Sequence, residues 1–166
     1  MVCGLPGVGK STFARRLAER SGFLIMESDA LRQVLFDPAT YGPTESARLF
    51  LAIHTLMGEL LAQGVPLIFD ATNLREAHRQ QVYRVAAAAG ATVVPVWVEA
   101  PATWVRQRLA RRRLSADPAD RSEADWQVYL RYRKEAQPIL GPHFRVDTSQ
   151  DLEPALERVL AALASS

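Results

Sequence analysis

The chain has 166 residues, of which 48% are hydrophobic and 23% charged, a composition typical of one soluble globular domain spanning 1–166. Its net charge of +2, from 20 basic and 18 acidic residues, is too small to indicate nucleic-acid binding by itself. A single cysteine excludes an internal disulfide, and no apolar run is long enough to span a bilayer. Because no secretory signal pattern opens the chain, we expect a cytoplasmic protein that does not contact a membrane.

The first predicted elements are a short strand over residues 1–3 and a helix over Lys10–Ser21, joined by a glycine-rich loop. The loop sequence, GLPGVGKS, fits the phosphate-binding P-loop pattern G-x-x-x-x-G-K-[ST]. Glycines let backbone N–H groups converge on a phosphate, and the helix that follows adds its positive dipole end. Lys10 is predicted to reach the β- and γ-phosphates of ATP as a binding and catalytic residue, and the Ser11 hydroxyl to bind Mg²⁺. The predicted nucleotide-binding residues of this loop are Gly4, Leu5, Gly7, Val8, Gly9, Lys10, Ser11 and Thr12. A chance glycine-rich turn is the alternative, but it does not account for the strand before the loop and the apolar helical stripe after it.

Further along the chain, short β-like runs alternate with helical ones, which predicts an α/β protein with a parallel sheet. The expected architecture is a three-layer P-loop NTPase fold in which a five-stranded parallel sheet carries helices on both faces. The other predicted strands are 23–26, 65–69, 92–98 and 144–146, and the other predicted helices are 30–36, 44–62, 74–89, 101–113, 122–136 and 152–164. The first strand has three residues where a central strand usually has about five or six. Either this strand is unusually short or the sequence lacks residues at its start.

Polar residues that follow the predicted strands form the candidate site, because ligands of parallel α/β proteins bind beyond the carboxyl ends of the strands. Asp29 follows the second strand and is the candidate general base for a hydroxyl acceptor, with a helix N-cap as the equally weighted alternative. Arg32, one helical turn later, is placed either to hold an anionic acceptor or to lie solvated on the surface. Asp70 follows the third strand and is the candidate Mg²⁺ residue, or else a turn residue. Thr72 and Asn73, just beyond it, are expected to contact the acceptor.

An arginine cluster occupies the predicted helix 101–113 and comprises Arg106, Arg108, Arg111, Arg112 and Arg113. Arg108 and Arg112 are four residues apart and therefore lie on one helical face, so both are predicted to bind the triphosphate and to act in catalysis. The loop that follows is rich in Ser, Asp and Pro, and residues 108–124 are predicted to form an arginine-bearing lid. The alternatives are a solvated amphipathic face, which fits Arg106 and Arg113 best, and a nucleic-acid patch with nearby aromatic side chains stacking on bases.

Four segments together carry a family resemblance: GLPGVGKST from Gly4, Ser28-Asp29-x-x-Arg32, Asp70-Ala71-Thr72-Asn73, and Arg108-x-x-x-Arg112. They resemble the P-loop kinases related to the polynucleotide 5′-kinases, a branch that includes zeta-toxin-like and gluconate- and shikimate-kinase-like proteins. The resemblance implies that Asp29 is the general base and that Arg32 contacts an acceptor-side phosphate. It also implies that Arg108 and Arg112 act on the ATP phosphates. The chain departs from the viral-type enzymes at Ala30, where they carry a second acid.

The motifs and the resemblance predict a kinase that uses ATP and Mg²⁺ and transfers the γ-phosphate to a hydroxyl, with the 5′-OH end of a nucleic acid as the favoured acceptor. The alternatives are a small-molecule kinase acting on a sugar acid, nucleoside or antibiotic, and a non-kinase ATP-binding regulatory protein. An open basic channel beside Arg32 and Tyr41 would favour a polymer, and a closed polar pocket a metabolite. An Asp29 side chain facing away from the γ-phosphate would favour the regulatory protein. No pattern predicts an oligomeric state.

Overall fold

The computed structural model describes residues 1–112 and 125–165, and within them the chain forms a five-stranded sheet in which every strand pair is parallel. The strands lie in the order β2-β3-β1-β4-β5. Their bounds are β1 Val2–Gly4, β2 Leu24–Glu27, β3 Leu67–Asp70, β4 Val96–Glu99 and β5 Phe144–Asp147. The central strand is β1, which pairs with β3 on one side and β4 on the other. The predicted α/β class and five-stranded parallel sheet are confirmed.

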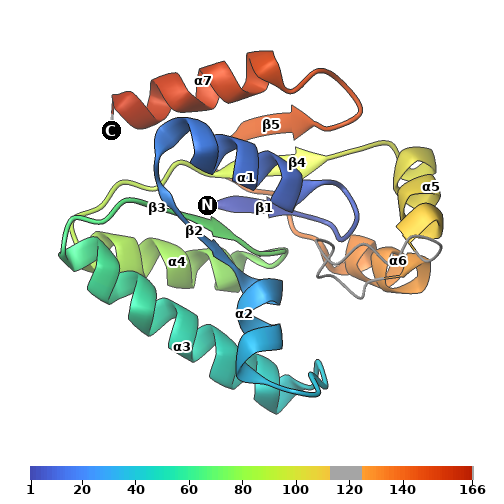
Figure 1. Cartoon of the computed structure of the whole chain (residues 1–166), viewed down its shortest axis with the longest axis horizontal. Helices are drawn as coiled ribbons and strands as arrows, with labels where there is room; N and C mark the ends of the chain where they lie inside the picture. Colours follow the sequence, from blue (N-terminus) through green and yellow to red (C-terminus); the bar gives the residue numbers. More distant parts are fainter. Residues whose placement is uncertain (113–124, 166) are drawn as a thin grey trace.

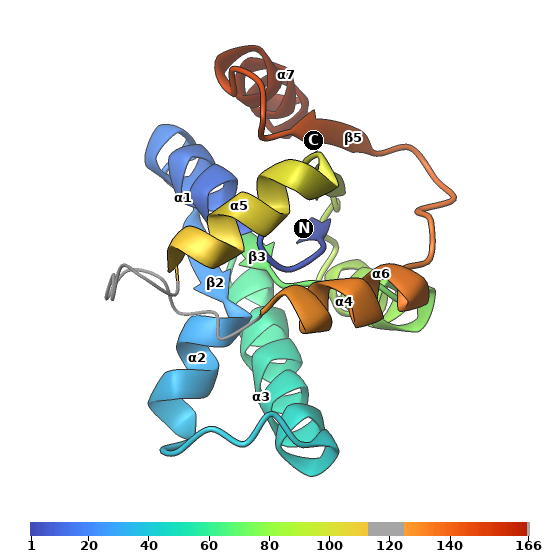
Figure 2. The ribbon, with the colours of Figure 1, turned by 90° about the vertical axis from the view of Figure 1, so that its right-hand side faces the viewer.

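Helices cover both faces of the sheet (Figure 1). Their bounds are α1 Lys10–Ser21, α2 Ser28–Leu35, α3 Pro43–Ala62, α4 Glu76–Ala88, α5 Ala102–Arg112, α6 Trp126–Glu135 and α7 Glu153–Ala164. In Figure 1, α1 and α7 lie above the sheet, while α3 and α4 lie below it. Figure 2 shows α5 and α6 side by side across the carboxyl ends of the strands. The predicted three-layer arrangement is therefore confirmed, and the strand exits open toward α5 and α6.

Two apolar clusters hold these layers together, one on each face of the sheet. The first joins α1, α5 and α7 to the sheet, and Phe13 and Leu156 within it are fully buried. The second joins α3 and α4 to the opposite face through residues such as Leu49 and Phe69. Burying one such side chain stabilises the fold by about 1.5–3 kcal/mol. The sheet beneath the strand exits is thus packed on both faces.

Several element bounds differ from the prediction because local backbone chemistry interrupts the apolar runs. The fourth strand begins at Val96 rather than residue 92 because Pro95 lacks an N–H, although its carbonyl still accepts a hydrogen bond from Phe144 N at 3.0 Å. The third strand begins after Pro66 for the same reason. Helix α6 begins at Trp126, where the Asp125 carboxylate caps the N–H of Val128 at 2.9 Å. The earlier helix start predicted at residue 122 lies outside the described residues.

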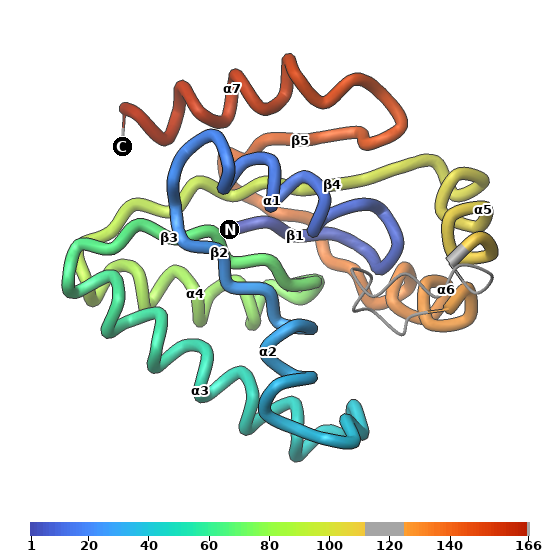
Figure 3. Tube along the Cα trace, in the orientation of Figure 1, coloured from blue at the N-terminus to red at the C-terminus, as the bar shows by residue number. Residues whose placement is uncertain are grey.

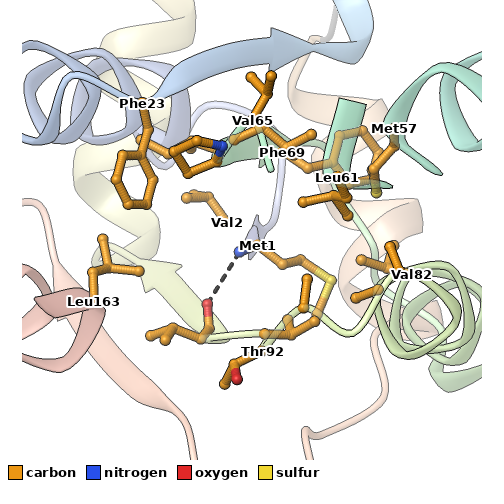
Figure 4. Close-up of a pocket in the computed structure, with 18 of the residues that line it drawn as sticks. Met1, Val2, Phe23, Met57, Leu61, Val65, Phe69, Val82, Thr92 and Leu163 are labelled. Carbon is orange, nitrogen blue, oxygen red and sulfur yellow. Dashed lines mark hydrogen bonds between the residues drawn. The ribbon is translucent and has the colours of Figure 1, made fainter. Parts of the chain in front are cut away.

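A cavity of about 420 Å³ lies at the amino-terminal ends of the strands, the edge opposite the glycine-rich loop. Figure 4 shows its mostly apolar lining, which includes Phe23, Met57, Val65 and Leu163. The Met1 ammonium borders this cavity and donates a hydrogen bond to Val94 O at 3.0 Å. Burial lowers the pKa of this amino group. The mostly apolar lining of this cavity does not suit a charged phosphate, and it lies at the sheet edge opposite the glycine-rich loop.

No helix among the described residues is both long enough and apolar enough to cross a membrane.

Candidate active site

The loop between β1 and α1 is shaped by three glycines whose backbone φ angles are positive. Gly7 and Gly9 have φ values of 77° and 93°, and Gly4 has 150°. A Cβ atom on Gly4 would lie 2.2 Å from the carbonyl oxygen of Val98, and one on Gly7 would lie 2.9 Å from the Leu109 side chain. The loop can therefore curl between β4 and α5 only because these positions lack side chains. Figure 3 shows the loop at the same end of the molecule as α5.

The start of helix α1 is left available for an anion. Its first turn carries no acidic side chain, and its N-cap, Gly9, offers no side-chain hydrogen bond. The first N–H groups of a helix and its dipole favour negative charge, and a phosphate group satisfies both. Lys10 Nζ donates to Leu5 O at 3.0 Å, so the ammonium is folded back over the loop. This cradle fits the polyphosphate of a nucleotide.

Asp70 lies at the end of β3 beside Ser11 and is 3% exposed. The Ser11 hydroxyl donates a hydrogen bond to its carboxylate, while its Oδ1 is buried without a partner. Burial raises the pKa of Asp70, and the charge of Lys10 and the Ser11 hydrogen bond oppose this rise. A buried carboxylate oxygen with no partner is costly unless a cation or a water satisfies it. Ser11 and Asp70 therefore supply oxygen atoms suited to Mg²⁺, a hard cation that prefers oxygen: the Ser11 hydroxyl as a direct ligand, and the Asp70 carboxylate as support for the ion or its bound water.

Asp29 lies in the first turn of α2, because this helix begins at Ser28. The N-cap alternative for Asp29 is therefore wrong, since the cap position belongs to Glu27, which makes no side-chain cap. The Glu27 carboxylate instead forms a two-pronged ion pair with Arg15, with both N–O distances at 2.8 Å. The negative charges of Glu27 and Asp29 both contribute to the raised pKa of Asp70, which places them within electrostatic reach of the candidate metal site.

Arg32 is buried in a network around Glu45, so the expectation of a solvated surface arginine is wrong. Its guanidinium forms an ion pair with the Glu45 carboxylate and donates to Ser46 Oγ at 3.2 Å. The guanidinium also lies 4.7 Å from the centre of the Tyr41 ring. The charge of Arg32 is thus already matched within the protein. Glu45, which sequence reasoning missed, stands thirteen residues away on another helix, and no local pattern connects the two.

Thr72 and Asn73 lie in the loop that leaves β3. The carbonyl of Thr72 accepts a hydrogen bond from Gly4 N at 3.1 Å, which ties this loop to the glycine-rich loop. Asn73 has a left-handed backbone conformation, with φ at 43°, and its side chain is buried with Nδ2 unpartnered. Both predicted acceptor residues are therefore on the same loop as Asp70.

Arg108 extends from α5 to the glycine-rich loop. Its Nη1 lies 2.7 Å from the position that a Cβ on Gly9 would occupy, and Thr148 Oγ1 lies 3.2 Å from the same point. The Thr148 hydroxyl donates a hydrogen bond to the Val8 carbonyl. The only sequence signal for this contact is that Thr148 directly follows β5. The Arg112 side chain and residues 113–124, which make up most of the predicted lid, lie outside the described residues.

The aromatic side chains near the arginines pack on one another. Trp126 stacks on the buried Tyr129 with ring centres 4.8 Å apart, and Arg106 lies 5.9 Å from the Trp126 ring.

Asp147, at the end of β5, accepts hydrogen bonds from the N–H and hydroxyl of Ser149, at 2.9 and 2.7 Å. In the described part of the chain, no group of three or more His, Cys, Asp or Glu side chains is arranged to hold a metal. A bound cation would therefore share its coordination with phosphate oxygens and water.

A family profile described as "AAA domain" matches residues 1–136. The chain belongs to the AAA domain family. A sequence comparison of this AAA domain protein with curated proteins gives no significant match.

Solved structures show that this AAA domain protein has the fold of the P-loop kinases. Kti12 from Chaetomium thermophilum in complex with ADP-AlF3 is 18% identical, with a TM-score of 0.79 over 99% of this chain and 96% of that one. APS kinase from Mycobacterium tuberculosis, in complex with AMPPNP and APS, is 19% identical, with a TM-score of 0.72 over 98% and 95% of the two chains. A chain of the Pnkp1/Rnl/Hen1 RNA repair complex is 20% identical, with a TM-score of 0.66 over 81% of this chain and 42% of that one.

Proposed function

We propose that the protein is an ATP-dependent phosphotransferase that moves the γ-phosphoryl group of ATP to a hydroxyl acceptor. The observation that carries this proposal is the buried, unpartnered Oδ1 of Asp70 beside Ser11, at the edge of a glycine cradle that fits polyphosphate. Structures of this fold hold AMPPNP and ADP-AlF3 in related proteins, which supports nucleotide binding in this one.

In the proposed reaction, the acceptor oxygen forms a bond to the γ-phosphorus while the bond from that phosphorus to the β–γ bridging oxygen breaks, leaving ADP. Asp29 accepts the proton that the acceptor hydroxyl loses. Lys10 and Arg108 stabilise the negative charge that spreads over the transferring group, because both are next to the glycine-rich loop. A magnesium ion held by Ser11, with Asp70 orienting its ligands, would neutralise charge on the β- and γ-phosphates. Arg112, on the same helix, is proposed to assist Arg108.

The acceptor is proposed to be a hydroxyl compound that contacts Asp29, Thr72 and Asn73. The fold neighbour in an RNA repair complex supports a 5′-OH polynucleotide end. The ion pair of Arg32 with Glu45 favours the second candidate, a small-molecule acceptor, because a guanidinium already matched by a buried carboxylate attracts an acceptor phosphate less strongly. If the acceptor is a polynucleotide end, Arg32 contacts its phosphate. If the acceptor is a small molecule, Arg32 serves to hold α2 against α3 through Glu45.

An acceptor screen with labelled ATP tests the proposal, using 5′-OH DNA, 5′-OH RNA, sugar acids and nucleosides. Asp29→Asn should lower kcat by about 10²-fold or more, as expected for a positioned base, without unfolding the protein. Glu27→Gln is the matched control, since this neighbouring acid is paired with Arg15, and it should retain most of kcat. Transfer to no acceptor, together with MgATP binding and slow hydrolysis, would instead identify an ATP-binding regulatory protein. Near-normal kcat in Asp29→Asn would remove the proposed base.

A further inference from the structure

Arg79 of α4 is an arginine with a completely buried side chain whose donors all have partners. Its Nε and Nη2 bond the Glu76 carboxylate at 2.9 and 2.7 Å. Its Nη1 donates to two backbone carbonyls, those of Asn73 at 3.0 Å and Leu74 at 3.1 Å, and its Nη2 donates to Pro138 O at 2.8 Å. A buried guanidinium is tolerated only when its donors are matched in this way.

Two of these carbonyls belong to the loop that follows β3. This loop carries Asp70 at its start, and at its end Asn73, whose backbone has the left-handed conformation that few residues other than Gly, Asn and Asp adopt. The hydrogen bonds from Arg79 go to the carbonyl of Asn73 and to the next one along the chain. These two hydrogen bonds therefore restrain the backbone directly after the Asn73 side chain. The same loop contains two buried polar atoms without partners, Asp70 Oδ1 and Asn73 Nδ2.

The third carbonyl belongs to the segment that follows α6, and this segment is docked on the same loop by further contacts. Gln137 N donates to Leu74 O at 2.8 Å, and Glu76 N donates to Gln137 Oε1 at 2.7 Å. At the exposed rim, Arg75 forms an ion pair with Glu135 at 2.6 Å. Arg79 thus lies where three segments meet: helix α4, the loop after β3, and the stretch after α6.

We propose that Arg79 is a positioning residue for the candidate metal and acceptor site. Its guanidinium fixes the loop after β3 in the conformation that leaves Asp70 Oδ1 and Asn73 Nδ2 available to ligands. This inference rests on the proposed function, because it assigns Asp70 to the magnesium site. A purely structural Arg79 would contribute to stability and leave the response to metal unchanged.

The test compares the affinity for ADP with and without Mg²⁺, measured by calorimetry at a temperature where circular dichroism shows each variant to be folded. Arg79→Met keeps an unbranched apolar stem and removes the donors, and Arg79→Lys restores the charge but not the planar fork. Arg75→Met is the matched control, since it removes an exposed link between the same two segments. If Arg79→Met does not fold, Arg79→Lys carries the comparison.

We expect metal-free ADP affinity to stay within about threefold of wild type in all variants. The gain in affinity from Mg²⁺ should fall by about 10–100-fold in Arg79→Met, the usual effect of removing a group that orients a metal ligand. It should fall less in Arg79→Lys and should be unchanged in Arg75→Met. If Mg²⁺ raises the ADP affinity of Arg79→Met as much as it raises that of wild type, the positioning role is overturned, even if the Tm of the variant is lowered. The proposed function would not be affected by that result. If the ADP affinity of the wild-type protein does not change with Mg²⁺, the metal role of Asp70 is refuted and this inference with it.

Discussion

Replacement of Gly9 by alanine should strongly weaken nucleotide binding at a small cost in stability, and a matched replacement of Gly22 separates the two effects. Both glycines have left-handed backbone angles, with φ at 93° and 72°. A Cβ on Gly22 would meet nothing within 4 Å, whereas a Cβ on Gly9 would lie 2.7 Å from Arg108 Nη1. The two alanine variants therefore share the backbone strain but differ in what the new methyl group displaces.

The strain of a left-handed non-glycine residue is about 1–2 kcal/mol. For a chain of this size each kcal/mol lowers Tm by roughly 2–4 °C, so both variants should melt about 2–8 °C below wild type. In Gly9→Ala the Arg108 guanidinium must also move, and the N–H groups of the loop no longer all point at the phosphate position. Each hydrogen bond to a charged phosphate is worth about 1.5–3 kcal/mol, so the loss of two weakens nucleotide binding by roughly 10²–10⁴-fold.

The assay is the dissociation constant of MgADP at 25 °C, with thermal denaturation of the free proteins measured in parallel. Gly22→Ala should bind MgADP as wild type does. An equal and near-normal affinity in both variants would show that the Gly9 region does not contact the nucleotide, and the assignment of the cradle would be lost.

Three further outcomes follow from single residues. Hydrogen bonds from the Thr40 hydroxyl and N–H, with help from Arg32, lower the pKa of Glu45 from 4.5 to about 2. Because the folded-state pKa is depressed, this carboxylate adds stability that is present above pH 4.5 and lost as pH falls toward 2, so Glu45→Gln should flatten acid denaturation over that window. Burial raises the pKa of Cys3 to about 11, so a thiol reagent at pH 8 should react only at the rate of unfolding, and fast native labelling would contradict this burial. Glu153 pairs with Arg16 and Arg20 on the surface, and Glu153→Gln should cost no more than about 1 kcal/mol in urea denaturation.

The elements whose bounds could be predicted from the sequence are those with a local physical cause. Helix α1 begins at Lys10 and ends at Ser21 as predicted, because Gly9 and Gly22 flank it with left-handed backbone angles that glycine alone adopts easily. The parallel sheet and the helices on both of its faces follow from the alternation of strands and helices along the chain. Such features need no knowledge of which distant segments meet.

Contacts between distant segments were beyond that reasoning. The burial of Arg32 depends on Glu45 arriving from α3, and the contact between Arg79 and Pro138 joins residues far apart in sequence. Nothing in the spacing around Arg32 distinguishes a guanidinium that meets a carboxylate inside the protein from one that awaits a ligand. The start of α2 at Ser28 places Asp29 in the first turn, which excludes the N-cap role that the sequence left as an equal alternative to a general base.

The enclosed position of the Met1 amino group has a practical consequence for anyone who produces this protein. A residue joined ahead of Met1 would turn this ammonium into an amide, whose N–H can still donate to Val94 O, and the added chain would pass through the apolar cavity between the ends of β3 and β4. A flexible Gly/Ser linker fills such a space poorly, whereas the exposed Ser165 near the carboxyl end can carry a tag without entering the sheet. Protein tagged at the two ends should therefore differ in melting temperature even though neither tag approaches the nucleotide cradle.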